Sequence, residues 1–283
     1  AVAREAACVA LLALVAVVFF WPVVSGRAWL PRGGGDSVSF LFPMYRFAAD
    51  SLHDGVIPFW NPHQYAGAPF LADNQSGLFY PFNLLLFLLR PGFGYGGIEA
   101  LVVWHFFLAG AAMYACLRLL RPEIPLGRPA ALLGALAFML SDVFITHIGN
   151  LNLIAVAAWL PLAFLGVHRA IFAPRPLGRV GWAAFGGAAL GIATLAGHGQ
   201  MTFLSAVFLG SYALYQTVAA RKGWALPLLV LLGAVAVALA AVSLFPAAGT
   251  LSQTLRAEFD YARSTNYALP PRALLGLFAP DFY

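Results

Sequence analysis

The stretch GGGDSVSFLFPMYRFAADSLHDGVIPFWNPHQYAGAPFLADNQSGLFYP, residues 33–81, is the one long polar interruption in an otherwise apolar sequence. It contains four of the eleven acidic residues, together with histidines, one arginine and several aromatic residues. Its glycines and prolines are typical of a shaped loop with short helices rather than a continuous helix. The sequence therefore separates an apolar frame, which decides the fold, from one polar loop, where we expect any chemistry to lie.

The composition places the apolar frame in a membrane. Hydrophobic residues make up 61% of the chain and charged residues 10%, with a mean hydropathy of +0.82, whereas a soluble domain has about 25% charged residues. The net charge of +5 does not indicate nucleic-acid binding, because the chain has a single lysine and its arginines are scattered in small groups. We therefore expect an integral membrane protein.

Apolar runs of roughly 20 residues, the length of one span, predict seven transmembrane helices. The first run, residues 6–24, is longer than the apolar region of a secretory signal, so we expect an uncleaved span. The other runs cover residues 98–120, 129–146, 151–172, 180–197, 200–219 and 224–246. The apolar run at residues 82–89 is too short to span. The predicted fold class is therefore all-α and polytopic, with a large first loop, residues 25–97, that contains short helices.

The charges of the loops predict the orientation in the membrane. The basic loops contain Arg118, Arg121 and Arg128, then Arg169, Arg175 and Arg179, and finally Arg221 and Lys222. The intervening turns, residues 141–150 and 197–200, contain neither Lys nor Arg. Because short cytoplasmic loops are enriched in Lys and Arg, we expect the amino terminus inside the cell, and loop 25–97 and segment 247–283 outside.

The Arg-rich, Lys-poor composition indicates the cytoplasmic membrane of a bacterium. The chain begins without methionine and ends without a polar tail. We expect residues 1–283 to form one transmembrane domain that is a fragment of a longer protein.

Asp36 is the candidate catalytic residue. It follows three glycines just after the first span, and glycine lets the backbone turn tightly and approach a ligand closely. A carboxylate fixed at the membrane surface can serve as a general base. The alternative is that Asp36 caps a helix that begins at Ser37, a position that aspartate favours. Asp50 and Asp54 have the spacing of the polar face and end of a short surface helix.

Aromatic and amide-bearing residues in the same loop indicate a saccharide site, since they match the apolar faces and the hydroxyls of sugars. The candidates are Trp60, Asn61, Asp73, Gln75 and Tyr80. Alternatively, Trp and Tyr mark the membrane interface. His198 and Gln200 lie in one outer turn and His147 lies in the preceding one, so we expect these turns and the polar loop to converge. The alternative to a binding role for His198 is that it only forms a hydrogen bond to a loop carbonyl.

Arg256 and Arg263 follow the last span, and their guanidinium groups could bind phosphate. Lipid headgroups or the neighbouring Glu258 and Asp260 are alternative partners. No spacing of a zinc helix is present. A divalent metal held by scattered carboxylates such as Asp36 and Asp73 stays an open alternative.

Taken in order, these motifs resemble the YfhO-type bacterial membrane proteins, which belong to the GT-C glycosyltransferases. The resemblance rests on the aspartate after the first span and on segments 59–62, 67–70, 73–77, 80–81, 197–200 and 277–282. It covers nearly the whole chain as the amino-terminal part of that family. Members are usually longer and have further spans.

The resemblance implies a multi-span helical enzyme that takes a sugar from a polyprenyl-phosphate donor to an extracytoplasmic acceptor, such as a surface glycan or teichoic acid. Asp36 would be the general base of an inverting transfer. Asp73 would position the acceptor or a metal near His198 and Gln200, and Arg256 or Arg263 would hold the phosphate.

Two other classes stay open. A transporter or flippase of lipid-linked glycans should have ionisable residues near the membrane midplane, and His105 is the clear candidate there, although a packed neutral imidazole is the simpler interpretation. A non-catalytic membrane scaffold is the third alternative.

Overall fold

The computed structural model describes residues 2–30, 35–89, 92–121, 123–254, 258–266 and 268–279. In this part of the chain nearly all regular structure is helical, as predicted. The exceptions are two-residue strands, β1 (Trp60–Asn61) and β2 (Ala68–Pro69), which form an antiparallel hairpin with Trp60 opposite Pro69.

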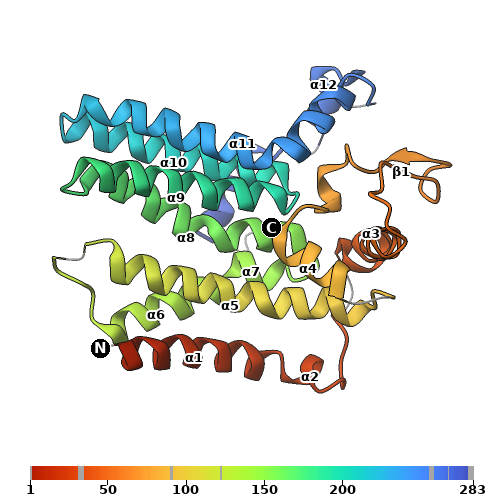
Figure 1. Cartoon of the computed structure of the whole chain (residues 1–283), viewed down its shortest axis with the longest axis horizontal. Coiled ribbons are helices and arrows are strands. Elements are labelled where there is room, and N and C mark those ends of the chain that lie inside the picture. The colour runs from red at the N-terminus through yellow and green to blue at the C-terminus, as the bar shows by residue number, and fades with distance from the viewer. Residues whose placement is uncertain are drawn as a thin grey trace.

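The long helices lie side by side in one bundle, with their axes roughly parallel (Figure 1). The bundle consists of α1 (Val2–Phe19), α5 (Tyr95–Leu119), α6 (Arg128–Met139), α8 (Leu151–Phe172), α9 (Pro176–Leu195), α10 (Gly199–Ala219) and α11 (Leu226–Leu251). Short connections make successive helices antiparallel. Each of these helices overlaps one of the seven predicted spans.

Among the described residues, five helical segments are long and apolar enough to cross a membrane: Val2–Phe19, Tyr95–Leu119, Arg128–Thr146, Leu151–Phe172 and Gly223–Leu251. The third of these combines α6 with the short helix α7 (Asp142–Thr146). The other two predicted spans, α9 and α10, form helices of 20 and 21 residues, but glycines in α9 and polar side chains in α10 lower their hydropathy.

The glycines of α9 let neighbouring backbones approach closely. A Cβ atom on Gly166 of α8 would lie 2.3 Å from the Cα of Gly186, and one on Gly187 would lie 2.4 Å from the carbonyl oxygen of Leu232 in α11. Small residues at such contacts are typical of helix packing in membranes. Helix α9 is therefore held tightly between α8 and α11.

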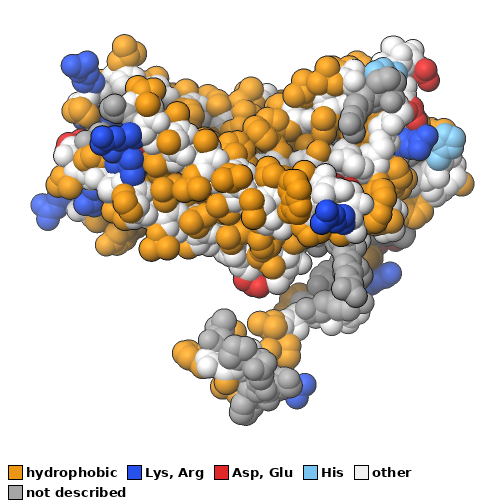
Figure 2. All heavy atoms as spheres, turned by 90° about the horizontal axis from the view of Figure 1, so that it is seen from below, with side chains coloured by type: hydrophobic (Ala, Val, Ile, Leu, Met, Phe, Trp, Pro, Cys, Tyr) orange, Lys and Arg blue, Asp and Glu red, His pale blue; other side chains and the backbone are white. Residues whose placement is uncertain are grey.

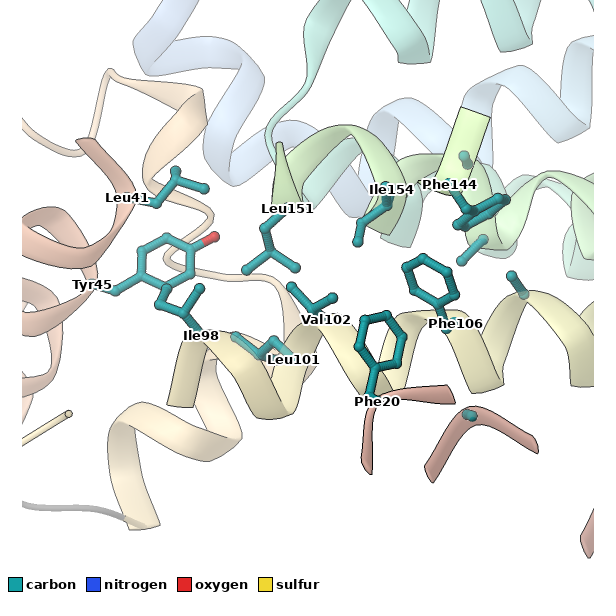
Figure 3. Close-up of a cluster of buried hydrophobic side chains, with 14 of the residues drawn as sticks. Phe20, Leu41, Tyr45, Ile98, Leu101, Val102, Phe106, Phe144, Leu151 and Ile154 are labelled. Carbon is teal, nitrogen blue, oxygen red and sulfur yellow. The ribbon is translucent and has the colours of Figure 1, made fainter. Parts of the chain in front are cut away.

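The polar loop folds against one end of the bundle. After α2 (Trp21–Val24) it forms η1 (Ser37–Leu41), α3 (Phe42–His53), the hairpin, η2 (Asn74–Ser76) and α4 (Pro81–Leu89). Figure 3 shows how Leu41 and Tyr45 of this loop point toward Ile98 of α5 and Leu151 of α8, within one buried apolar cluster. Helix α4 has nine residues, about 14 Å at 1.5 Å per residue, and is too short to span, as predicted.

The two ends of the bundle differ in charge. We call the end with residues 35–89 and the turns 147–150 and 197–198 the loop end, and the opposite end, with connections 120–127, 173–175 and 220–222, the basic end. Figure 2 shows several Lys and Arg side chains gathered at the basic end, whereas at the loop end basic side chains lie together with Asp, Glu and His side chains, as in the Arg46–Asp50 pair. At the basic end, Glu5 of α1 pairs with Arg118 and Arg128, each at 2.9 Å.

Two glycines of α9 give a test of the packing. Gly187→Ala should destabilise the protein by about 1–3 kcal/mol, because the added methyl group overpacks the contact with α11. Gly181→Ala, on the same helix with no atom within 4 Å of its Cβ position, should be neutral or stabilising, since alanine favours helix by about 1 kcal/mol over glycine. Thermal unfolding in detergent micelles measures both. Equal effects of the two substitutions would contradict the packing of α9.

Candidate functional site

Asp36 lies at the start of η1, but its side chain does not cap that helix. Its Oδ2 atom instead accepts a hydrogen bond from Nδ2 of Asn150, 3.0 Å away, in the turn before α8. The side chain of Asp36 is exposed. Asp36 therefore stands at the predicted N-cap position without making the capping bond, and its solvent-accessible carboxylate is held by an amide from another part of the chain.

The backbone beside Asp36 is fixed to Gly149. Both the N–H and the Oγ–H of Ser37 donate to the carbonyl oxygen of Gly149, at 3.1 and 2.9 Å. Gly35 has a φ of +92°, and a Cβ atom there would lie 2.5 Å from the Cα of Gly149. The glycine before Asp36 is thus required by its backbone conformation and by a close contact. Gly33 and Gly34 lie outside the described residues.

His198 forms the N-cap of α10, where its Nδ1 atom accepts a hydrogen bond from the backbone N–H of Met201 at 3.1 Å. His198 thus makes a local bond, but not the one to a loop carbonyl that we considered, because its partner is an N–H group. Burial lowers the pKa of His198; the charge of nearby His147 lowers it further and the carboxylate of nearby Asp36 raises it. The outer segments that contain Asp36, His147 and His198 therefore lie close together.

The segment of residues 73–77 packs beside the turn that contains His198. Asp73 caps η2 through Oδ1, which accepts from the N–H of Gln75 at 2.9 Å. Burial raises the pKa of the Asp73 carboxyl, and the bond from Gln75 offsets part of that rise. A Cβ atom on Gly197 would lie 2.2 Å from the carbonyl oxygen of Asn74. Asp73 thus shapes the backbone next to the site.

Asn150 and Asn152, at the start of α8, are site residues that the sequence analysis did not select. Asn152 donates through Nδ2 to the carbonyl oxygen of Gln75 at 2.8 Å and accepts at Oδ1 from the Tyr45 hydroxyl at 2.9 Å. It therefore joins η2, α3 and α8. Their position offers a signal in the sequence, because both asparagines stand at the start of an apolar span.

Tyr80 was predicted to bind substrate, but its side chain is 1% exposed. Its hydroxyl lies 2.7 Å from Nε2 of His105 and accepts from Nε1 of Trp159 at 2.9 Å. Nδ1 of His105 lies 2.6 Å from the carbonyl oxygen of Leu101. This chain of bonds assigns the proton of His105 to Nδ1 and leaves Nε2 to accept from Tyr80. We therefore give Tyr80 a structural role. The packing expected for His105 is confirmed, since the ring is buried and both of its nitrogens have partners.

The hairpin lies at the outer edge of the loop end, beyond α3 (Figure 1). Asn61 is buried, and its Oδ1 atom accepts from the N–H of His63 at 2.9 Å. The Trp60 side chain is 55% exposed, with its ring against Gly67, where a Cβ atom would lie 2.6 Å from the ring. The side chains of Gln75 and Gln200 are exposed.

Arg263 lies exposed in the short helix α12 (Tyr261–Ser264), beyond the end of α11 (Figure 1). Its guanidinium carbon is 4.2 Å from the centroid of the Phe259 ring, and its backbone N–H donates to Asp260. Arg256 lies outside the described residues. In the part of the chain that the structure describes, no group of three or more His, Cys, Asp or Glu side chains could hold a metal ion.

Comparisons with protein-family models, curated proteins and solved structures found no match for this chain. The resemblance to YfhO-type proteins therefore stays a prediction.

The N-cap predicts a pH dependence of stability. Because the folded-state pKa of His198 is lowered, the unfolded chain binds a proton more readily than the folded chain does. The stability that the neutral His198 cap contributes is therefore lost as pH falls below about 6.5, the unperturbed pKa of histidine. His198→Asn keeps a good cap without a titrating group. Melting temperatures between pH 7.5 and 5.5 should fall less in this variant than in the wild type. Equal slopes would contradict this role of His198.

The network around Tyr80 predicts a loss of stability. Tyr80→Phe removes the hydroxyl and leaves buried groups on His105 and Trp159 without their partner, which costs about 1–3 kcal/mol for an unsatisfied group. Denaturant unfolding in detergent measures the loss. Any activity per folded molecule should be unchanged. A loss of activity without a loss of stability would show instead that Tyr80 binds substrate, as the sequence predicted.

Proposed function

We propose that this chain is the membrane part of a glycosyltransferase that moves a sugar from a polyprenyl-phosphate-linked donor to an extracytoplasmic glycan acceptor. One observation carries the proposal: the exposed carboxylate of Asp36 is free of the capping role and is oriented by Asn150 through a single oxygen. A second support is its position, where a polar loop meets a bundle of apolar helices.

In the proposed reaction, Asp36 acts through Oδ1 as the general base. It takes the proton of an acceptor hydroxyl while that oxygen forms a bond to the anomeric carbon of the donor. The bond from this carbon to the phosphate oxygen breaks on the opposite face, so the anomeric configuration inverts and polyprenyl phosphate leaves. The bond from Asn150 to Oδ2 directs the other oxygen toward the acceptor, since hydrogen bonding restricts rotation of the carboxylate.

His198 supplies a further donor in this proposal. Its Nδ1 atom accepts a hydrogen bond, so the neutral ring carries its proton on Nε2. The lowered pKa keeps the ring neutral near pH 7. A neutral N–H donor near Asp36 can stabilise the leaving phosphate without pairing with the base and lowering its reactivity.

We place the protein in the cytoplasmic membrane of a bacterium, with the basic end inside and the loop end outside. The gathering of Lys and Arg at one end supports this orientation (Figure 2). The lipid part of the donor would lie along the apolar surface of the bundle. A transporter has less support, because His105 is fully engaged in the interior network.

The test is Asp36→Asn in the full-length protein, reconstituted in liposomes with a polyprenyl-phosphate-linked sugar and a glycan acceptor. Loss of a general base should lower kcat by about 10²–10⁴-fold, with little change in melting temperature. Asn150→Ala should lower kcat less, because it removes only the orienting bond. Asp142→Asn, an exposed acid on α7, is the matched control. Full activity of folded Asp36→Asn protein would refute the assigned role.

A further inference from the structure

A hollow lies in the loop end between α3 and the hairpin, and none of the catalytic candidates lines it. Its volume is about 570 Å³, within the roughly 300–1,000 Å³ of typical small-molecule sites. We call it the α3–hairpin groove. Its polar lining consists of Ser39 on η1, Arg46, Asp50 and Ser51 on α3, Asp54 directly after α3, and Asn61, His63 and Gln64 on the hairpin.

The walls of this groove are held in place by contacts among its lining residues and with Phe70 behind them. The Phe47 ring, which also lines the groove, packs edge-on against His63 and Phe70, with centroid distances of 5.9 and 5.2 Å. Asn61 and His63 are joined through the bond to Asn61 Oδ1. The groove is therefore a preformed feature of the folded loop, and its aromatic ring and amides have fixed positions.

The charges of the groove select among ligands. Arg46 and Asp50 are one helical turn apart and form an ion pair of 3.7 Å, with both side chains about half exposed. Asp54 adds a second carboxylate to the lining. An anionic ligand such as a phosphate or a uronic acid would meet two carboxylates for one guanidinium. Neutral or amino-bearing ligands are favoured instead.

The chemistry of the lining matches a saccharide. Carboxylates accept hydrogen bonds from hydroxyls, and Arg46, Gln64 and the amide of Asn61 can donate. Phe47 offers an apolar surface for the C–H face of a pyranose ring. With Oδ1 of Asn61 already bonded, its Nδ2 donor is the group that it can offer to a ligand.

We propose that the α3–hairpin groove binds neutral or amino-sugar residues of the acceptor glycan, away from the bond-forming carboxylate. This inference rests on the proposed function. The groove reaches toward the catalytic region through η1, since Ser39 and Phe40 line it and η1 begins directly after Asp36. Asp50 and Asp54, which we expected to form a solvated helix face, become ligand-binding residues.

The experiment measures binding directly, by saturation-transfer NMR on the full-length protein in a detergent without a sugar headgroup. The probes are maltose, glucosamine and glucuronate. Maltose or glucosamine should bind at least tenfold more tightly than glucuronate. Asp54→Ala/Gln64→Ala should weaken that binding by at least tenfold, since the variant loses one hydrogen bond to a charged group and one to an amide. Asp142→Ala is the control and should bind as the wild type does.

The outcomes separate this inference from the proposed function. Failure of all three probes to bind, preference for glucuronate, or unchanged binding by the double variant would each overturn the groove assignment. Asp36→Asn should bind the probes normally, because Asp36 does not line the groove. If that variant also retains transfer activity, the catalytic proposal fails while the groove assignment stands.

Discussion

The contact between Gly35 and Gly149 is the constraint on which the loop end depends. The two backbones lie too close for any side chain at Gly35, and the adjacent Ser37 donates twice to the carbonyl oxygen of Gly149. These bonds join the start of the polar loop to the turn between α7 and α8. The position of Asp36 beside Asn150 follows from this contact, since the carboxylate lies between two anchored residues.

A chain of buried polar side chains extends this attachment across the loop. The Tyr45 hydroxyl accepts from Asn83 and donates to Asn152, which in turn donates to the backbone of η2. Deeper in the bundle, Trp159, Tyr80 and His105 form a separate chain. Where water is excluded, an unmade hydrogen bond is costly, so each network permits one arrangement of the loop on the helices. Some polar residues that look functional in the sequence, such as Tyr80 and His105, thus have a structural role, whereas others, such as Asp36, are accessible to a ligand.

The loop end contains two polar regions with different physical characters. The region around Asp36 is built from three segments that meet at the entrance of α8, and its carboxylate raises the pKa of the nearby His198, against the larger effect of burial. The α3–hairpin groove is built within the loop itself, around Phe47 and an ion pair. The transferase that we propose would have to hold two unlike substrates, a lipid-linked sugar and a polymer. Two regions of this kind, on a loop anchored to apolar helices, fit that requirement.

The sequence by itself determined the helical class, the positions of the long helices and the division between a basic end and a loop end. The lengths of the apolar runs and the charges of the loops are local properties of the chain, so they do not depend on how the helices pack against one another. It also indicated Asp36 and the turn of His198, because polar residues between apolar spans stand out. The folded structure was needed to show that Tyr80 is interior, that Asp73 and His198 cap helices, and that Asn150 bonds to Asp36. Only it brought α3 and the hairpin together as a groove. These outcomes depend on which distant residues meet, and hydrogen-bond partners separated by 25 to 114 positions leave no periodic pattern in the chain.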